Sequence, residues 1–334
     1  DYHVNSGQEE VFLLKGYAGT GKTSLLSALV KAAPLMKKET MLLAPTGRAA
    51  KVLSSYSGKQ AFTIHKKIYQ ARSQRDGSIS FIRSKNFHKN TFFIVDEASM
   101  IQGAGHGTGN YLFSDADLLT DLIEFVRSGN NCRLILIGDI AQLPPVGIAI
   151  SPAMDANYLR ESYHLHIRML ELKEVMRQSL DSGILANATL LREKLMNNNF
   201  DQPLMQIAGQ KDIQVIEPAM LEDALNDAFG CTDNSGAVLI TSSNKRANIY
   251  NREIRRRILY RDEEISAGDR LMVVKNNYFW ISEDEELDFI ANGDIAEVEK
   301  IYSYEELYGF RYANVCLRFV DYKNVEIDCK IFLE

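Results

Sequence analysis

A glycine-rich loop near the start of the chain has the residue types and spacing that bind phosphate groups. It reads Gly16-Tyr17-Ala18-Gly19-Thr20-Gly21-Lys22-Thr23 and matches the pattern G-x-x-x-x-G-K-[ST]. An apolar run precedes the loop, and a helix-like run from Ser24 to Ala33 follows it. In that setting backbone N–H groups close around phosphate oxygens, and the helix N-terminus adds its positive end.

This loop predicts ATP as the ligand, with Mg²⁺ beside the phosphates. Lys22 is expected to reach the β- and γ-phosphates, and the Thr23 hydroxyl is expected to bind the metal. The predicted nucleotide-binding residues are Gly16, Ala18, Gly19, Thr20, Gly21, Lys22, Thr23, Ser24 and, further along, Asp139. A chance glycine-rich turn is the alternative interpretation, and the flanking strand and helix patterns argue against it.

Two acidic motifs follow later apolar runs. Asp96-Glu97-Ala98-Ser99 comes directly after Phe92–Val95, where Asp96 is expected to hold Mg²⁺ and Glu97 to act as general base on the attacking water. The second motif begins Gly138-Asp139-Ile140-Ala141-Gln142. There Asp139 is expected near the metal, and Gln142 is expected to orient water or sense the γ-phosphate. A solvated acidic turn is the alternative for the first motif.

Short apolar runs must position these motifs. Val11–Lys15, Met41–Ala44, Thr91–Val95 and Arg133–Ile137 read as buried strands that alternate with helix-like segments. This alternation predicts an α/β fold with a parallel sheet covered by helices on both faces. Ligands of such sheets bind beyond the carboxyl ends of the strands, where each motif above lies.

The second half of the chain has a different pattern. A second domain is expected to start at residue 166, with a strand at Ala237–Thr241 and a helix over Arg246–Leu259. From Asp269 onward the chain is rich in strand-like runs. Between the expected strands of the first half, Arg75-Asp76-Gly77-Ser78 predicts a hairpin turn.

Composition excludes some classes of protein and leaves others open. The chain has 334 residues and a net charge of −6, so nucleic-acid binding would need a local basic channel. No apolar run reaches the roughly 18 residues of a membrane-spanning helix. The four cysteines show no zinc-ligand spacing and are interpreted as reduced packing residues, which predicts a cytoplasmic location.

The motifs together resemble those of superfamily 1B DNA helicases of the RecD type, related to the exonuclease V alpha subunit. The resemblance rests on the loop at Gly16–Thr23, Ala44-Pro-Thr-Gly-Arg-Ala-Ala50, Thr63-Ile-His65, the Asp96–Ser99 segment, Gly138–Val146 and Glu174-Val-Met-Arg177-Gln178. Gly268–Asn276 and Asn292–Asp294 resemble the segment that leads into the family's small SH3-like insertion. The resemblance covers residues 11 to about 300.

The resemblance implies a P-loop NTPase with two RecA-like parallel-sheet domains. Domain 1A would span residues 1–165 with a 1B hairpin insertion at about 66–90, domain 2A residues 166–270, and a β-rich SH3-like 2B insertion residues 271–334. It also implies that Arg177 reaches the γ-phosphate from the second domain. The implied DNA contacts are Pro45, Thr46, Arg48, Thr63, His65, Thr241 and Asn244. For His65, a satisfied structural histidine remains the alternative.

One departure from the family pattern concerns the end of the sequence. Members of the family close with a segment similar to A-Y-A-x-T-x-H-K-x-Q-G, and nothing in this chain matches it. The closest local match, Phe310-Arg311-Tyr312-Ala313-Asn314, lacks the His-Lys and Gln-Gly pairs. The expectation is therefore a second motor domain that is incomplete in this chain.

The functional prediction is an ATP-dependent DNA helicase or translocase that moves 5′ to 3′, with polarity taken from the resemblance alone. Its expected partners are single-stranded DNA or a junction of single and double strands, and other repair or recombination proteins. Two alternatives remain open. One is a P-loop ATPase that remodels protein partners without nucleic acid, and the other is the helicase subunit of a nuclease complex.

Overall fold

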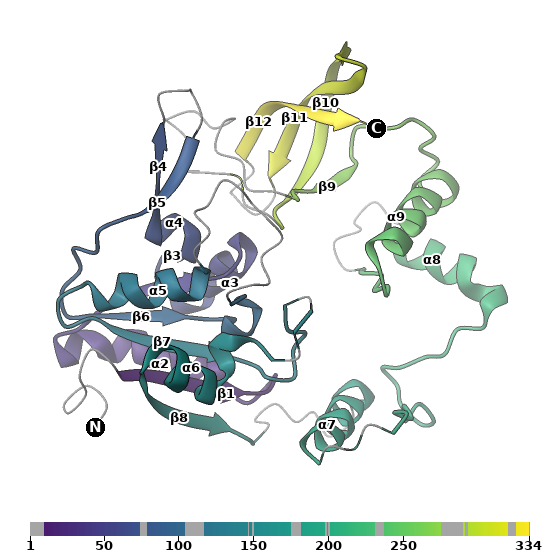
Figure 1. Cartoon of the computed structure of the whole chain (residues 1–334). Helices are drawn as coiled ribbons and strands as arrows, with labels where there is room; N and C mark the ends of the chain where they lie inside the picture. Colours follow the sequence, from purple (N-terminus) through teal and green to yellow (C-terminus); the bar gives the residue numbers. More distant parts are fainter. Residues whose placement is uncertain are drawn as a thin grey trace. The chain divides into compact units, whose positions relative to one another are not determined.

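The computed structural model in Figure 1 divides the chain into two compact units, which are described separately. The first unit comprises Asp1–Gln178 and Ala291–Gly293, and the second comprises Ser179–Ile290 and Asp294–Glu334. The residues that the structure describes are 10–73, 79–103, 117–145, 147–148, 150–174, 182–197, 199, 201–230, 237–274, 290, 293–319 and 325–333.

The first unit is built on a parallel sheet of six strands in the order β3-β2-β6-β7-β1-β8. The strands are β1 (Glu10–Gly16), β2 (Glu39–Ala44), β3 (Ala61–Thr63), β6 (Thr91–Val95), β7 (Arg133–Gly138) and β8 (His166–Leu172). In β6 and β7 every residue is buried, as expected for strands covered on both faces. The predicted parallel sheet is confirmed.

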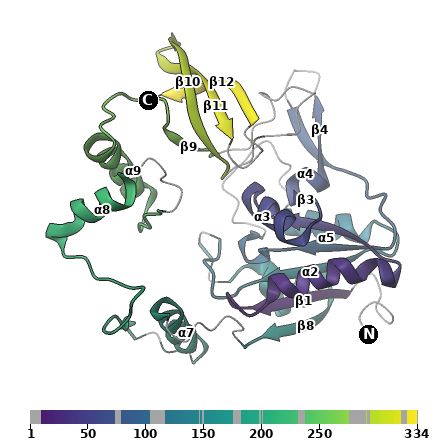
Figure 2. The ribbon, with the colours of Figure 1, turned by 180° about the vertical axis from the view of Figure 1, so that it is seen from behind.

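Helices pack on both faces of this sheet (Figures 1 and 2). On one face, α2 (Lys22–Ala32) and α3 (Gly47–Ser57) bury Leu26 and Leu53 against Ile135 and Ile137 of β7. On the other face, α4 (Ile64–Ile68), α5 (Leu118–Arg127) and α6 (Ala156–Tyr163) pack against Leu134 and Leu136 of the same strand. Alternate residues of β7 therefore belong to two separate cores.

Strand β8 corrects the expected domain boundary. The sequence interpretation assigns residues from 166 onward to a second domain, yet β8 pairs in parallel with β1 along its whole length, from Glu10↔His166 to Gly16↔Leu172. It forms the edge of the first sheet and lies beside the strand that leads into the glycine-rich loop. The first unit consequently extends past the expected boundary.

A two-stranded antiparallel hairpin is inserted between α4 and β6. Its strands are β4 (Tyr69–Ser73) and β5 (Ile79–Arg83), with Tyr69 opposite Arg83 at the open end. The chain enters and leaves the insertion at neighbouring points, because the Ser84 N–H donates to the Ile68 carbonyl at 2.7 Å. The two strands of the hairpin expected within about 66–90 are present, and the Asp76-Gly77 turn lies outside the described residues.

Among the described residues of the second unit, the second RecA-like sheet that the resemblance implied is not seen. Its helices are α7 (Gly183–Met196), α8 (Leu221–Phe229) and α9 (Asn244–Glu253), the last continued by a π-helical turn over Ile254–Ile258. The segment expected to form a strand at Ala237–Thr241 has no regular structure, and Val238 and Ile240 are exposed. Across the described ranges, only one parallel sheet of this kind is seen.

The end of the second unit is an antiparallel sheet, as its strand-like runs predicted. Its order is β12-β11-β10-β9, formed by β9 (Arg270–Met272), β10 (Ile295–Leu307), β11 (Phe310–Phe319) and β12 (Val325–Leu333). Val298, Val315 and Phe319 lie in a core of its own. Asp269, just before β9, binds the guanidinium groups of Arg255 and Arg261, which ties the π-helical turn to this sheet.

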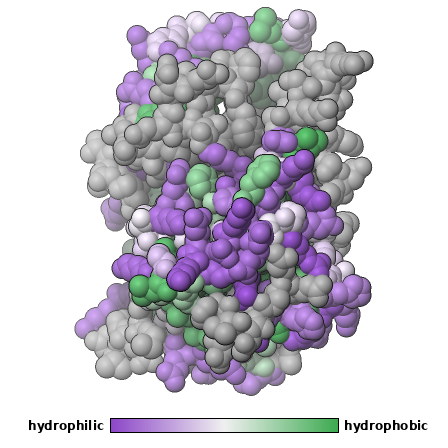
Figure 3. Space-filling model, turned by 90° about the vertical axis from the view of Figure 1, so that its left-hand side faces the viewer, coloured by the Kyte–Doolittle hydropathy of each residue, from purple (hydrophilic) through white to green (hydrophobic). Residues whose placement is uncertain are grey.

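The polarity of the surface and the state of the described cysteines can be compared with what the composition indicated. Among the coloured residues of the face in Figure 3, hydrophilic side chains predominate and hydrophobic ones are scattered. Cys132, Cys316 and Cys329 are buried free thiols, and Cys231 lies outside the described residues. No helix in the described part of the chain is long and apolar enough to cross a bilayer.

Candidate functional site

The glycine-rich loop connects the carboxyl end of β1 to the N-terminus of α2. Gly19 and Gly21 have φ angles of 79° and 90°, a region that side chains with a Cβ rarely adopt. Gly16 is needed for a different reason, because a Cβ there would lie 2.7 Å from Thr20 Oγ1 and 3.2 Å from Leu172 Cβ. The loop geometry thus depends on glycine at each of the three positions.

Lys22 lies inside the loop at the first position of α2. Its Nζ donates to the carbonyl oxygens of Gly16 at 2.6 Å and of Tyr17 at 2.9 Å. It also lies 3.8 Å from the Asp139 carboxylate, which is only 4% exposed. This ion pair connects the loop after β1 with the end of the neighbouring strand β7, two predicted site regions that the sheet brings together.

The remaining residues of the loop and helix start differ in their exposure to solvent. Thr20 is buried, and its hydroxyl donates to the Tyr17 carbonyl at 2.8 Å. Ala18, Thr23 and Ser24 are exposed. The Thr23 hydroxyl, predicted as a metal ligand, therefore lies on the accessible side of the helix start.

Asp96 and Glu97 follow β6, the strand next to β7. The Glu97 N–H donates to Asp96 Oδ1 at 3.0 Å, and Glu97 has a left-handed φ of 54°. Burial, followed by the neighbouring Asp96 carboxylate, raises the pKa of Glu97 above its usual range. A half-buried carboxyl group with a raised pKa is a suitable proton acceptor near neutral pH.

Gln142 and Ser99 form a contact between the two acidic motifs. The Ser99 hydroxyl donates to Gln142 Oε1 at 3.0 Å, which joins the turn after β6 to the turn after β7. Asp139 Oδ1 accepts from the Ala141 N–H at 2.8 Å, so this carboxylate shapes the turn that carries Gln142. The structure therefore brings Lys22, Glu97, Asp139 and Gln142 to adjacent strand ends.

Tyr56 belongs to this site although no sequence motif indicated it. It lies on α3, and its hydroxyl donates to Asp96 Oδ2. Burial, and then this hydrogen bond, raise the pKa of the Tyr56 hydroxyl. Tyr56 and Asp96 are 40 residues apart, and neither the spacing nor the residue type near Tyr56 distinguishes it from a packing residue of α3.

Residues predicted as DNA contacts in the first unit lie at the ends of the next two strands of the sheet. The Thr46 hydroxyl caps α3 by accepting from the Ala49 N–H, and the Thr63 hydroxyl caps α4 by accepting from the Lys66 N–H, both at 3.2 Å. Arg48 is exposed. His65 is half-buried near the Tyr69 ring, and burial lowers its pKa. Pro45, half-buried, follows β2 directly.

The structure does not test the placement of three predicted site residues. Arg177 lies outside the described residues. Thr241 and Asn244 belong to the second unit, where the Thr241 hydroxyl donates to the Ser243 carbonyl at 3.1 Å and Asn244 begins α9. Within the described ranges, no group of three or more His, Cys, Asp or Glu side chains is arranged to hold a metal ion.

A family model described as an AAA domain (AAA_30) matches residues 2–204, which is more than half of the chain. Two curated relatives cover most of this chain. The uncharacterised protein R530 of Acanthamoeba polyphaga mimivirus is 26% identical over 323 residues, covering 86% of this chain and 60% of that protein. The ATP-dependent DNA helicase Dda of Enterobacteria phage T4 is 26% identical over 270 residues, covering 78% and 55%.

Similarity to other known proteins is more local or more distant. The ATP-dependent RecD2 DNA helicase of Deinococcus radiodurans is 32% identical over 135 residues, covering 40% of this chain and 16% of that protein. Among solved structures, the Pif1 helicase from Bacteroides in complex with ADP-AlF3 and single-stranded DNA superposes with a TM-score of 0.48 at 16% identity, covering 97% of this chain and 71% of that one. The chain spans less than two thirds of the length of each curated relative compared here.

Proposed function

Because this chain belongs to the AAA_30 family of AAA domains, we propose that it uses ATP hydrolysis to move along single-stranded DNA as a helicase or translocase. The observation that carries the proposal is the order of the parallel sheet. Strands β1, β7 and β6 end in the glycine-rich loop and the two acidic motifs, and β2 and β3 end beside them in the two helix-capping motifs. Two relatives that bear the name DNA helicase support the same reading.

In the proposed reaction, each side chain at the nucleotide end of the sheet has one task. Lys22 would neutralise charge on the β- and γ-phosphates, and Glu97 would accept a proton from the attacking water. Gln142, held by Ser99, would orient that water. Arg177, to which the family resemblance gives this role, is proposed to add a positive charge at the γ-phosphate.

Magnesium fits the donor atoms of this site. Nucleotide-bound Mg²⁺ uses one or two carboxylates together with substrate phosphates, and Thr23 and Asp96 offer oxygen donors of that kind. The Asp96 carboxylate already accepts a hydrogen bond from Tyr56, an outer-shell partner of the type that orients metal ligands. When bound, the ion would stabilise negative charge on the phosphates.

Replacement of Tyr56 by phenylalanine should raise the Mg²⁺ concentration that half-saturates ATP hydrolysis. The change removes only the hydroxyl that donates to Asp96, so the carboxylate loses its orienting partner. Outer-shell changes of this type weaken metal affinity about 10- to 100-fold, and the lower end is expected here. Magnesium titrations of ATPase activity in both proteins measure the effect. An unchanged half-saturating Mg²⁺ concentration would mean that Tyr56 contributes to packing and does not orient Asp96.

The proposed DNA contacts lie at the β2 and β3 ends of the sheet. The N-terminus of α3, an 11-residue helix, carries Arg48 exposed on its first turn. Backbone N–H groups and the dipole of a helix N-terminus attract phosphate, and an exposed arginine adds charge-assisted contacts. Pro45, Thr46, Thr63 and His65 are proposed to line this region, and Thr241 and Asn244 are proposed to contribute from the second unit.

The proposal predicts ATPase activity that single-stranded DNA stimulates strongly. Turnover should be measured with and without an oligonucleotide, and the half-saturating oligonucleotide concentration should rise steeply with salt. About four phosphate contacts would weaken binding to single strands nearly 50-fold between 50 mM and 200 mM salt. ATPase turnover that the oligonucleotide does not change would favour an ATPase that remodels protein partners. A half-saturating oligonucleotide concentration that does not change with salt would favour the same alternative.

A further inference from the structure

The turn that follows β6 holds Glu97 in a backbone conformation that a glutamate rarely adopts. Glu97 has φ 54° and ψ 36°, in the left-handed region, and directly precedes a short 3₁₀ helix over Ala98–Met100. Residues other than glycine keep such angles only where the surrounding structure fixes them. Inside the turn, the Met100 N–H donates to the Glu97 carbonyl at 3.0 Å, and the Ile101 N–H donates to the Ala98 carbonyl at 3.1 Å. These two bonds shape the turn but do not attach it to another segment.

Ser151, which lies 50 residues after Ile101, attaches this turn to a distant segment of the unit. Its hydroxyl donates to the Ile101 carbonyl at 2.7 Å and shares its proton with the Ala98 carbonyl at 3.2 Å. The hydroxyl therefore reaches carbonyl groups near both ends of the 3₁₀ helix. Ser151 is 2% exposed, so water does not compete for these bonds.

The segment that carries Ser151 packs closely against the end of β7. Met154 is buried in the same core cluster as Ala98. A Cβ on Gly138, the last residue of β7, would lie 2.7 Å from Met154 Sδ and 3.1 Å from the Ser99 nitrogen. Glycine at this position thus lets the Ser151 segment and the turn after β6 both lie directly beside β7.

The turn carries or holds two of the groups assigned to ATP hydrolysis. Glu97 directly precedes Ala98, the residue whose carbonyl binds Ser151. Ser99 directly follows Ala98, and its hydroxyl donates to Gln142 Oε1 at 3.0 Å. A shift of this turn would therefore displace Glu97 and Gln142 together.

We propose that Ser151 is a positioning residue for ATP hydrolysis, whose hydroxyl fixes the turn after β6 so that Glu97 and Gln142 act on the same water molecule. The proposal rests on the ATPase function proposed above. The serine acts through the backbone of the turn, so its effect falls on the chemical step and not on the affinity for ATP. Small displacements of a catalytic group are costly because the reacting atoms must lie within a narrow range of distances.

Replacement of Ser151 by alanine removes the hydroxyl and keeps the Cβ. At saturating ATP and single-stranded DNA, turnover should fall about tenfold, less than the roughly 100-fold that a displacement of about 1 Å can cause. The Kd for ATP should stay within about twofold of the wild type, because an interaction that serves only the chemical step leaves binding unchanged. Ser151→Cys keeps a weak donor of similar volume and should recover part of the turnover. Wild-type turnover in Ser151→Ala, or a loss of ATP affinity as large as the loss of turnover, would overturn the proposal.

A double-mutant cycle tests whether Ser151 acts through Glu97. In Glu97→Gln the proton acceptor is already lost, so the added Ser151→Ala should lower the residual turnover by about twofold or less, because residues that act as a unit are not additive. General loosening of the fold would instead lower turnover by about tenfold in both backgrounds, as independent effects do. That result would overturn the positioning role.

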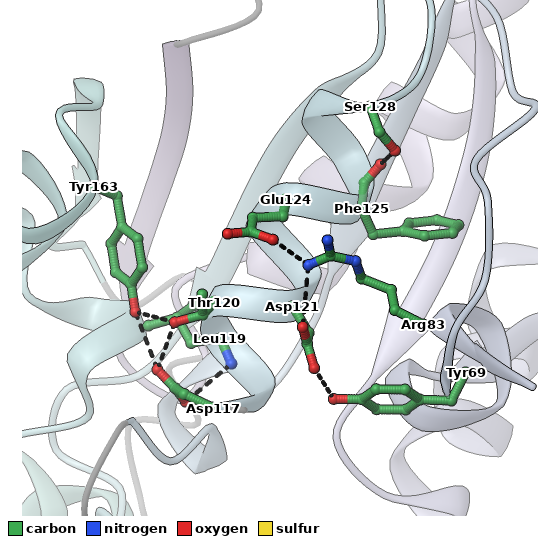
Figure 4. A network of polar contacts seen from close by, with 10 residues as sticks. All are labelled: Tyr69, Arg83, Asp117, Leu119, Thr120, Asp121, Glu124, Phe125, Ser128 and Tyr163. Carbon is green, nitrogen blue, oxygen red and sulfur yellow. Dashed lines mark hydrogen bonds and ion pairs between the residues drawn. The ribbon is translucent and has the colours of Figure 1, made fainter. Parts of the chain in front are cut away.

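The matched control is Ser128→Ala, which removes another serine hydroxyl that donates to a backbone carbonyl. Ser128 follows α5, and its hydroxyl donates to the Phe125 carbonyl at 2.7 Å (Figure 4). This variant should leave both turnover and the Kd for ATP unchanged.

Thermal unfolding of each variant shows whether it folds. If Ser151→Ala does not fold, Gly138→Ala displaces the same turn from the β7 side, because its Cβ would press on Met154 and on the Ser99 backbone. It should lose turnover and keep ATP affinity, and wild-type turnover in that variant would overturn the proposal. A wild-type protein that binds ATP without hydrolysing it would instead remove the proposed ATPase function itself.

Discussion

Replacement of Lys22 by alanine is expected to abolish productive binding of Mg-ATP. The ammonium group lies within the loop, where it donates to the carbonyl oxygens of Gly16 at 2.6 Å and of Tyr17 at 2.9 Å, and we expect it to contact a phosphate that the loop encloses. Hydrogen bonds to charged groups contribute about 1.5–3 kcal/mol each, so loss of two would raise the Kd about 100-fold or more. Titration with a fluorescent ATP analogue, followed by competition with ATP, measures this change directly.

Two further variants separate the phosphate contact from folding. Lys22→Ala also leaves the buried Asp139 carboxylate without its ion-pair partner at 3.8 Å, so thermal unfolding of the variant must be recorded. Lys22→Arg keeps a positive charge near Asp139 but cannot act as a compact point charge inside the loop, and it should also lose ATP. Lys31→Ala, an exposed lysine of the same helix, should bind normally. Wild-type affinity in Lys22→Ala would refute the nucleotide-loop assignment.

Glu97→Gln should retain ATP binding and lose about 10²- to 10⁴-fold in turnover, the usual contribution of a general base. Glutamine has nearly the same size as glutamate and keeps hydrogen-bonding capacity next to Gln142, but it cannot accept a proton. Binding and single-turnover hydrolysis should be measured on the same preparations. Equal losses in binding and turnover would make Glu97 a structural or metal-binding residue.

The pH dependence of turnover provides an independent check on Glu97. Its pKa is raised, chiefly by burial and then by Asp96, so the carboxyl group takes up a proton at a higher pH than an exposed glutamate. Only the ionised form can act as a base, and wild-type turnover should therefore fall as the pH decreases through this raised pKa. The residual activity of Glu97→Gln should lack that acidic limb. An identical limb in both proteins would assign the titration to another group.

The positions of the motifs could be predicted because each one is local. Gly16–Thr23 and Asp96–Ser99 directly follow apolar runs, and parallel strands necessarily bring their carboxyl ends to one edge of a sheet. Glu97 and Asp139 accordingly lie at neighbouring strand ends, as the sequence suggested. The roles of these residues remain predictions, since position alone does not establish chemistry.

Contacts between distant segments could not be predicted. The hydrogen bond from Tyr56 to Asp96 depends on how α3 packs over the sheet, which no spacing in the sequence encodes. The apolar run Val238-Leu239-Ile240 has the composition of a strand, but composition indicates a tendency to be buried and does not supply a pairing partner. Strand β8 does have a pairing partner, the strand β1. That partner lies more than 150 residues earlier in the chain, so the local sequence could not indicate the pairing.

The hairpin insertion has a modular character that follows from its attachment. Ile68 and Ser84 are joined by a hydrogen bond of 2.7 Å, so the 15 residues between them leave and rejoin the chain at nearly one place. Insertions of this type can be shortened, lengthened or replaced while the rest of the fold keeps its chain path. Asp121 of α5 limits which replacements are tolerated, because it is buried and is bound by Tyr69 and Arg83 of the hairpin. A replacement hairpin must supply groups that bind this carboxylate, or a second substitution must remove its charge. Variation in the hairpin and variation at position 121 are thus expected to be inherited together.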